Sequence, residues 1–176
     1  MTDLVAYVRL LIADTAGASQ VFSNEELQQI LDNWRQDVYY QTLSYRPTIV
    51  PGGTTTYLTW AASVGWWEDS ETLCDSDYAA LTAASSDRQR GVWTFAATQA
   101  TVLITGSYYD VYGAAADAVG IWASKVKLEF DFSADNAEYK RSQKLAALTT
   151  LMTTLRSLSA SGGVNTAQMI REDVTV

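Results

Sequence analysis

The sequence predicts a mainly α protein with a four-helix core and a β-rich insertion between its second and third helices, an α+β arrangement. Apolar residues recur at helical spacing in the first and last parts of the chain, whereas the stretch between them is rich in Thr, Trp, Tyr and Val. Pro47 and the run Pro51-Gly52-Gly53 break helical continuity between the first part of the chain and the stretch rich in Thr, Trp, Tyr and Val. The expected parts are the N-terminal helices of the core (1–46), the β-rich insertion (47–105), the C-terminal helices of the core (106–160) and a flexible C-terminal arm (161–176).

Two amphipathic helices are expected in the first part. In each of them the apolar residues share one face, which comprises Leu4, Val5, Val8, Leu11 and Ile12 in the first helix and Leu27, Ile30, Leu31, Trp34 and Val38 in the second. A capping box predicts the start of the second helix, because Ser23 can accept from the amide of Glu26 while the Glu26 carboxylate accepts from the amide of Ser23. Phe22 and Leu27 then form a hydrophobic staple, and residues 14–19 form a turn.

The insertion has the alternation and composition of β-structure. Strands are expected at 54–62, 64–68, 92–96 and 101–105, and the stretch 74–90 is left open between a loop and a short helix. Four of the six tryptophans lie in this part: Trp60, Trp66, Trp67 and Trp93. Three roles stay open for them, namely packing in the insertion's own core, a protein-contact surface, and a platform that stacks on carbohydrate.

Helical periodicity returns after Ser107, which we expect to cap a helix with Asp110 in its first turn. One stripe of this helix comprises Val111, Ala115, Ala118, Val119, Trp122 and Val126. A last helix carries Leu145, Leu148, Met152, Leu155 and Leu158 and ends before Gly162-Gly163. The arm beyond it is too short to form a core. Its candidate residues for contact with a partner or a neighbouring subunit are Ala167, Met169, Ile170, Arg171, Val174 and Val176.

The composition excludes the commonest catalytic machinery. The chain of 176 residues contains no histidine, so histidine-based catalytic pairs and histidine-ligated zinc are absent. The single cysteine, Cys74, lies between acids that disfavour its thiolate. Lys and Arg number 12 against 20 Asp and Glu, a formal charge of −8, which argues against a surface that binds phosphates. We therefore expect no enzymatic activity.

The acidic pairs of the sequence do not have the spacing of a calcium loop, and we interpret them as solvated or helix-capping residues: Glu68 with Asp69, Asp75 with Asp77, and Asp131 with Asp135. No catalytic, metal-binding or cofactor-binding residue is predicted. The chain has no signal-peptide pattern and no run near the roughly 18 apolar residues of a membrane span, so we expect a cytosolic protein without membrane partners.

Two parts of the sequence resemble a known family. Residues 5–15, V-A-Y-V-R-L-L-I-A-D-T, and residues 21–27, V-F-S-N-E-E-L, resemble the opening R-x-L-I-x-D followed by F-S-D-E-E-L of tailed-bacteriophage head-tail connector (adaptor or neck) proteins. Residues 105–117, 122–123, 130–135 and 141–144 resemble the helix-helix unit of phage neck proteins that carry a β insertion. The insertion itself matches no motif of the family.

The resemblance implies a structural protein of the virion neck, made in the cytoplasm of the bacterial host. Copies of the chain would form a ring of about twelve under the capsid portal, extend the DNA channel, and dock the next neck protein, a stopper or tail terminator. DNA would pass through the channel without specific binding. The partners implied are therefore the chain itself, the portal protein and the next neck protein.

Two other classes of function stay open. The tryptophans of the insertion would serve a carbohydrate-binding or capsid-decorating module. A hydrolase would need convergent carboxylates, for which Glu68, Asp75 and Asp77 are the residues to test.

Overall fold

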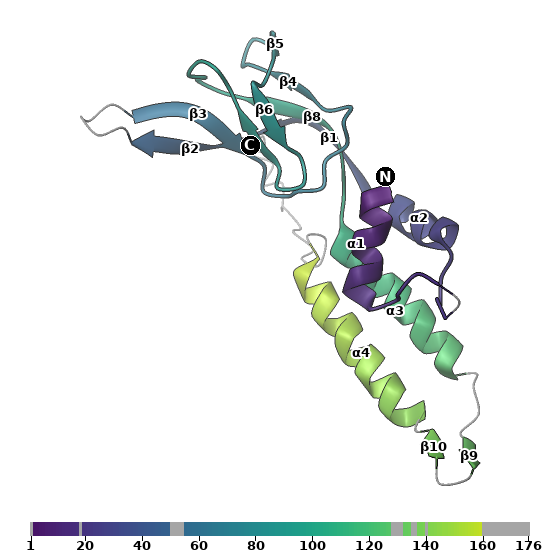
Figure 1. The fold of residues 1–176 in the computed structure, drawn as a ribbon. Coiled ribbons are helices and arrows are strands. Elements are labelled where there is room, and N and C mark those ends of the chain that lie inside the picture. The colour runs from purple at the N-terminus through teal and green to yellow at the C-terminus, as the bar shows by residue number, and fades with distance from the viewer. Residues whose placement is uncertain are drawn as a thin grey trace, which may run out of the picture.

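The computed structural model describes residues 2–17, 19–49, 55–127, 132–134, 137–139 and 141–159. Two four-stranded sheets form one end of the molecule, and the helices extend from them to a small two-stranded sheet at the other end (Figure 1). The helices are α1 (Thr2–Ile12), α2 (Asn24–Asn33), α3 (Val111–Lys127) and α4 (Arg141–Leu158). The strands are β1 (Arg35–Thr42), β2 (Ser44–Ile49), β3 (Thr55–Ala61), β4 (Thr72–Cys74), β5 (Ala80–Leu81), β6 (Ser85–Asp87), β7 (Val92–Thr94), β8 (Leu103–Tyr109), β9 (Phe132–Ala134) and β10 (Ala137–Tyr139).

The expectation of a mainly α protein built on a four-helix core is wrong. The structure is α+β, with two four-stranded sheets of order β1-β8-β4-β5 and β2-β3-β7-β6 beside its four helices. Strand structure runs from residue 35 to residue 109, so it begins before and ends after the expected insertion at 47–105. The sheets also have a hydrophobic cluster of their own, separate from the cluster that the helices share.

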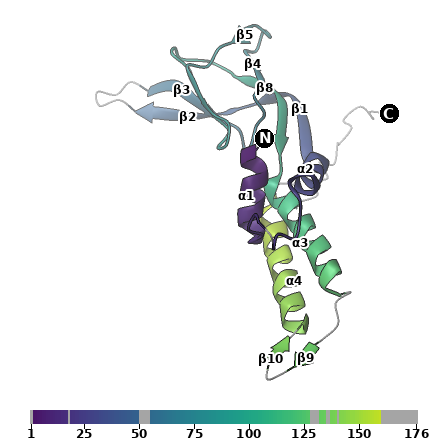
Figure 2. The same ribbon diagram turned by 45° about the vertical axis from the view of Figure 1, so that its right-hand side comes forward.

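The helices pack around α3. The α3–α4 pair extends away from the sheets as a long hairpin, and α1 and α2 cover α3 near the sheets (Figures 1 and 2). The apolar face predicted for α1 is confirmed, since Val5, Val8 and Ile12 are buried. The small side chains of alanine allow the other helices to pack closely against α3. Four alanines of α3 are fully buried: Ala114, Ala115, Ala116 and Ala118.

The predicted capping box of α2 is confirmed. The amide of Ser23 donates to Glu26 Oε2 at 2.7 Å, and the amide of Glu26 donates to Ser23 Oγ at 3.1 Å. Phe22 and Leu27, the expected staple, are both fully buried in the helical cluster. Lys125 of α3 reaches this cap, with its Nζ 4.5 Å from the centre of the Phe22 ring.

The second predicted helix is too long. It ends at Asn33, and the chain continues directly into β1, where Val38 faces the sheet cluster instead of a helix. Tyr39 and Tyr40 are both exposed at a bulge in this strand. The spacing of Trp34 and Val38 fits a helix as well as a strand, and only the pairing of β1 with β8, more than sixty residues away in the sequence, decides between them.

The start of α3 is also displaced from its prediction. Ser107 lies in β8 and does not cap a helix. Asp110 is the cap, because its Oδ1 accepts from the amide of Gly113 at 2.9 Å and its carbonyl accepts from the amide of Ala114 at 3.0 Å. Gly113 is required there: a Cβ at this position would lie 2.4 Å from Cε3 of Trp34.

The expected strands of the insertion are partly confirmed. Strands β3, β7 and β8 lie at three of the predicted positions, but 64–68 contributes only the isolated bridge of Trp67 to Tyr108. The stretch 74–90, which the sequence left undecided between a loop and a short helix, contains the end of β4, then β5 and β6, joined by turns. Strand β3 pairs with β7 only at Thr59–Ala61, so the outer part of the β2–β3 hairpin projects beyond the sheet (Figure 1).

Candidate interaction surfaces

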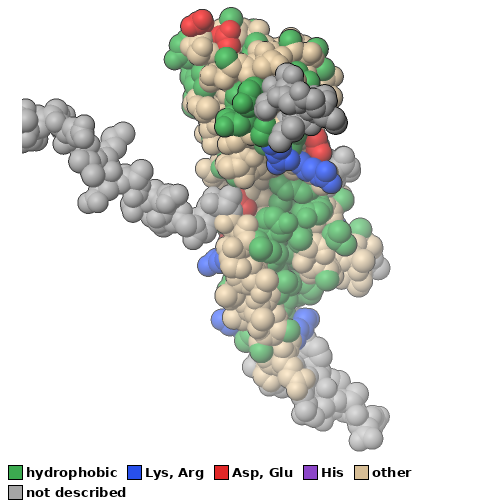
Figure 3. All heavy atoms as spheres, turned by 90° about the vertical axis from the view of Figure 1, so that its left-hand side faces the viewer, with side chains coloured by type: hydrophobic (Ala, Val, Ile, Leu, Met, Phe, Trp, Pro, Cys, Tyr) green, Lys and Arg blue, Asp and Glu red, His purple; other side chains and the backbone are tan. Residues whose placement is uncertain are grey.

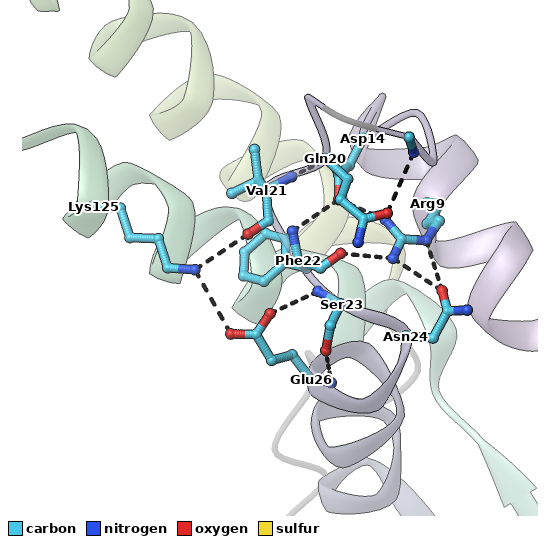
Figure 4. A network of polar contacts seen from close by, with 10 residues as sticks. Arg9, Asp14, Gln20, Val21, Phe22, Ser23, Asn24, Glu26 and Lys125 are labelled. Carbon is cyan, nitrogen blue, oxygen red and sulfur yellow. Dashed lines mark hydrogen bonds and ion pairs between the residues drawn. The ribbon is translucent and has the colours of Figure 1, made fainter.

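A hydrogen-bonded clasp joins α1 and α2, and it contains residues that carry the family resemblance (Figure 4). Arg9 on α1 donates from Nη1 to Asp14 Oδ2 at 2.8 Å and from Nη2 to the carbonyl of Phe22 at 2.6 Å. Its Nε and Nη2 donate to Asn24 Oδ1 at 3.2 and 3.0 Å. Asp14 accepts from the amides of Val21 and Phe22 at 2.7 and 3.2 Å. Residues of the motif that resembles the phage family therefore stabilise the turn between α1 and α2.

The end of α1 positions the carboxylate of this clasp. Ala13 adopts a left-handed conformation with φ 55°. The amide of Asp14 donates to the carbonyl of Arg9 at 3.0 Å and the amide of Ala13 to that of Leu10 at 3.3 Å, the pattern of a Schellman cap. This reversal brings Asp14 back beside Arg9 on the preceding turn.

Three of the four tryptophans proposed as an insertion interface lie inside the molecule. Trp60, Trp67 and Trp93 are 3%, 5% and 1% exposed and pack between the two sheets, where the ring centres of Trp67 and Trp93 are 5.7 Å apart. Trp66 is partly buried and stacks on Tyr7 of α1 at 4.5 Å. This burial supports packing in the insertion's own core, because Trp60, Trp67 and Trp93 offer little surface to a partner.

Tyrosines, not tryptophans, form the exposed aromatic surface of the sheets. Five of them are exposed by 36% to 74%: Tyr39, Tyr40, Tyr45, Tyr57 and Tyr78. Four of them form two edge-to-face pairs, with ring centres 5.1 Å apart both for Tyr40 with Tyr78 and for Tyr45 with Tyr57. Tyrosine is enriched at protein interfaces because it offers a large rigid ring and a polar end.

Tyr40 and Tyr78 are also strained. Their φ angles are 52° and 63°, in the left-handed region that residues with a Cβ seldom adopt. The bulge in β1 holds Tyr40, whose amide donates to Thr105 Oγ1 at 2.9 Å. Strained residues that are also exposed aromatics are typical of functional surfaces.

An ion-pair cluster joins the start of β1 to the loop before β4. Arg35 at the start of β1 donates from Nε to Glu68 Oε1 at 2.8 Å and from Nη2 to Oε2 at 3.1 Å. This hydrogen bonding lowers the pKa of Glu68 to about 2. Burial, followed by the hydrogen bond to Glu68, raises the pKa of Tyr109 to about 12. The two shifts widen the pH range over which the carboxylate is ionised and the phenol is protonated.

A cavity of about 340 Å³ lies where the sheets meet the helices. Its apolar lining includes Trp66, Tyr112 and Leu158, and its charged lining includes Arg46 and Arg90. A larger groove of about 590 Å³ lies beside the clasp on α1 and α2. The Arg9 guanidinium that borders this groove is already hydrogen-bonded within the clasp.

Two of the three acidic pairs of the sequence contain residues with structural partners. Asp75 Oδ1 accepts from the amides of Asp77 and Ala79, both at 2.9 Å, and so holds the β4–β5 turn. Asp131 and Asp135 lie outside the described residues. Among the residues that the structure describes, no group of three His, Cys, Asp or Glu side chains is placed to hold a metal ion.

The arm lies outside the described residues, and with it the six candidate contact residues Ala167, Met169, Ile170, Arg171, Val174 and Val176. Within the described ranges, no helix is long and apolar enough to cross a membrane. The exposed tyrosines are interface candidates that the sequence pattern did not predict. Consecutive aromatics at Tyr39-Tyr40 were the available signal, since a strand of regular alternation buries one of two neighbours.

Comparison of the chain with protein-family models, with curated proteins and with solved structures finds no match.

Proposed function

We propose that the protein is a structural head-tail connector (adaptor) subunit of a tailed bacteriophage. In this role it forms a ring under the capsid portal, extends the DNA channel and docks the next neck or tail protein. The observation that carries the proposal is the set of exposed tyrosines on the sheets, Tyr39, Tyr40, Tyr45, Tyr57 and Tyr78, on a chain whose sequence offers no histidine and no activated nucleophile. Exposed aromatic residues suit a subunit that functions through contact with other subunits.

The clasp gives a second line of support. The letters R, D and F-S-N of the resembling sequence are residues Arg9, Asp14, Phe22, Ser23 and Asn24. Four of them take part in the contacts that join α1 to α2, and Ser23 caps α2. A motif that is required for packing a local helical unit is expected to recur in proteins that share that unit. The resemblance therefore has a physical basis in this chain, and the function that it implies is a proposal.

The carbohydrate-binding or capsid-decorating alternative relied on a platform of tryptophans in the insertion. Trp60, Trp67 and Trp93 are buried between the sheets. A sugar would have to stack on the tyrosines instead, and no observation favours a sugar over a protein there. We therefore do not put this alternative forward as a second function.

The test of the proposal is assembly of the purified protein, alone and with its portal, followed by mass photometry and negative-stain imaging. We expect rings from the wild-type chain and none, or far fewer, from the double variant Tyr40→Asn and Tyr78→Asn. Asparagine tolerates the left-handed conformation better than tyrosine, so these substitutions remove both rings while relieving backbone strain. An unchanged circular dichroism spectrum and melting temperature of the variant then separate loss of assembly from loss of the fold.

The matched control is Leu10→Ser, which removes an apolar side chain that is 75% exposed on α1, away from the sheets. This variant should assemble like the wild type. A wild-type chain that stays monomeric both alone and with the portal would contradict the connector role. Rings formed equally well by the double asparagine variant would show that the tyrosines are not the contact surface.

A further inference from the structure

The cavity between sheets and helices has a closely packed wall. The loops 62–67 and 88–91 approach each other so closely that a Cβ at Gly65 would lie 2.1 Å from the carbonyl oxygen of Gln89. Gly91, with φ 64°, would place a Cβ 2.2 Å from the carbonyl oxygen of Val64. Trp66 lines the cavity with φ 63°, a strained value for a residue with a side chain. Strain and close backbone packing of this kind are found where a protein preserves the shape of a site.

The cavity combines an apolar floor with a cationic rim. Trp66, Tyr112 and Leu158 line it on the helical side, and Leu158 is 56% exposed. Arg46 has no ion pair with any described residue, and Arg90 has only an exposed contact with Asp87 at 3.7 Å. On a chain of net charge −8, two such arginines favour an occupant that carries carboxylates beside apolar side chains. Figure 3 shows Lys and Arg side chains at this level, above a hydrophobic surface of the helices.

The one carboxylate on the cavity wall is already engaged. Asp110 accepts from the amide of Gly113 through Oδ1 and from the hydroxyl of Ser159 through Oδ2. It lies at the start of α3, whereas Arg46 lies on β2 and Arg90 before β7. The rim that faces the sheets is therefore available to an acidic group.

The chain delivers a segment of matching chemistry to the mouth of this cavity. The described C-terminal part ends at Ser159, and Leu158 beside it lines the cavity. The sequence that follows, 160–176, places Met169-Ile170 just before Arg171-Glu172-Asp173. From Ser159 to Glu172 an extended chain reaches about 40 Å, which exceeds the width of the cavity, and Gly162-Gly163 permits the chain to reverse.

We propose that residues 164–173 bind this cavity of their own protomer. Met169 and Ile170 cover Trp66, Tyr112 and Leu158, and Glu172 and Asp173 pair with Arg46 and Arg90. Tethering favours this arrangement, because a short connection gives an effective concentration in the millimolar range, so that even a weak contact is well occupied. The proposal goes beyond the connector function and does not depend on it. In a connector, such binding would hold the arm until a partner competes for it.

The experiment measures hydrogen exchange of the amides of residues 164–173 in the full chain and in a free peptide of the same sequence. We expect several-fold slower exchange in the full chain, at a rate that is independent of protein concentration. The double variant Arg46→Glu and Arg90→Glu should exchange at the rate of the peptide, and so should Glu172→Lys with Asp173→Lys. All four substitutions together should restore most of the protection, since the charges are then exchanged between the partners.

The matched control is Arg156→Glu, which reverses an exposed arginine of α4 that lies near Ser159 but does not line the cavity. It should leave the exchange of 164–173 unchanged. Unprotected amides in the wild-type chain would overturn the proposal, as would protection that the reversal at Arg46 and Arg90 does not alter. Protection that appears only at high protein concentration would place the segment in a second copy and would also overturn it.

Discussion

Arg9 and Asp14 form a buried ion pair in which the residues are only 7% and 3% exposed. Removing two charges from water is costly unless the remaining donors and acceptors are satisfied. Here the guanidinium also reaches the carbonyl of Phe22 and the amide oxygen of Asn24, and the carboxylate also receives two backbone amides. The pair therefore holds a specific turn geometry, and each member depends on the other.

We predict that Arg9→Ala lowers the free energy of unfolding by about 3–5 kcal/mol, because Asp14 is left buried without its counter-ion. Urea denaturation followed by circular dichroism measures this change. The control is Arg156→Ala, which removes a surface pair with Asp117 in which the arginine side chain is 60% exposed and should cost no more than about 1 kcal/mol. Equal losses for the two variants would show that the clasp has no special role in stability.

The sequence identified Arg9 and Asp14 only as letters of a resembling motif. Their contact could not be read from spacing, because residues five apart on a continuous helix do not face each other. The left-handed turn at Ala13 brings them together, and an alanine gives no sign of such a turn.

Among the elements, β1 shows where local patterns stop being informative. Residues 35–42 contain Val38, Tyr39, Tyr40 and Thr42, which favour a strand, yet Trp34 and Val38 also continue the apolar spacing of α2. The hydrogen bonds that decide the outcome come from β8. The burial of the tryptophans also depends on pairing between distant strands, since Trp60 of β3 lies opposite Trp93 of β7.

The junction between β1 and the loop that carries Glu68 is expected to depend on pH. The pKa of Glu68 lies at about 2, below its usual value of 4.5, because Arg35 hydrogen-bonds the ionised form. A lowered pKa in the folded state stabilises the protein above pH 4.5, and this contribution is lost as the pH falls toward 2. We therefore expect the melting temperature of the wild type to fall more steeply across this range than that of Glu68→Gln.

The neighbouring substitution Asp69→Asn serves as the control for this titration. The Asp69 side chain is 95% exposed, and its contact with Arg88 is 3.6 Å long, so its removal should leave the pH profile close to that of the wild type. If the curves of the wild type and Glu68→Gln run parallel between pH 4.5 and 2, the Arg35–Glu68 pair does not stabilise the junction.

For the whole molecule, the charge distribution bears on contact with nucleic acid. The chain carries −8, and several of its cations are committed: Arg9 to Asp14, Arg35 to Glu68 and Arg88 to Glu71. The excess of carboxylates over cations opposes the neutralisation of phosphates that DNA binding requires. In the connector proposal, such a surface near the channel would repel DNA and let it slide.

We expect the isolated protein not to bind duplex DNA at about 0.15 M salt, where screening confines charge interactions to about 8 Å. Fluorescence anisotropy of a labelled duplex measures this, with a basic DNA-binding protein as the positive control in the same buffer. Tight binding that weakens steeply with added salt would contradict the expectation, since it would reveal a cationic surface able to release counterions.

The sequence by itself determined the features that depend on near neighbours: the apolar faces of α1 and α3, the capping box at Ser23 and Glu26, and the lack of histidine chemistry. Such features arise from contacts three or four residues apart, which the 3.6-residue period of a helix records directly. Only the tertiary structure decided that residues 35–109 form two sheets, that three tryptophans lie between them, and that the tyrosines are left exposed. Those outcomes depend on pairing between strands far apart in the sequence, which the period of a single segment does not encode.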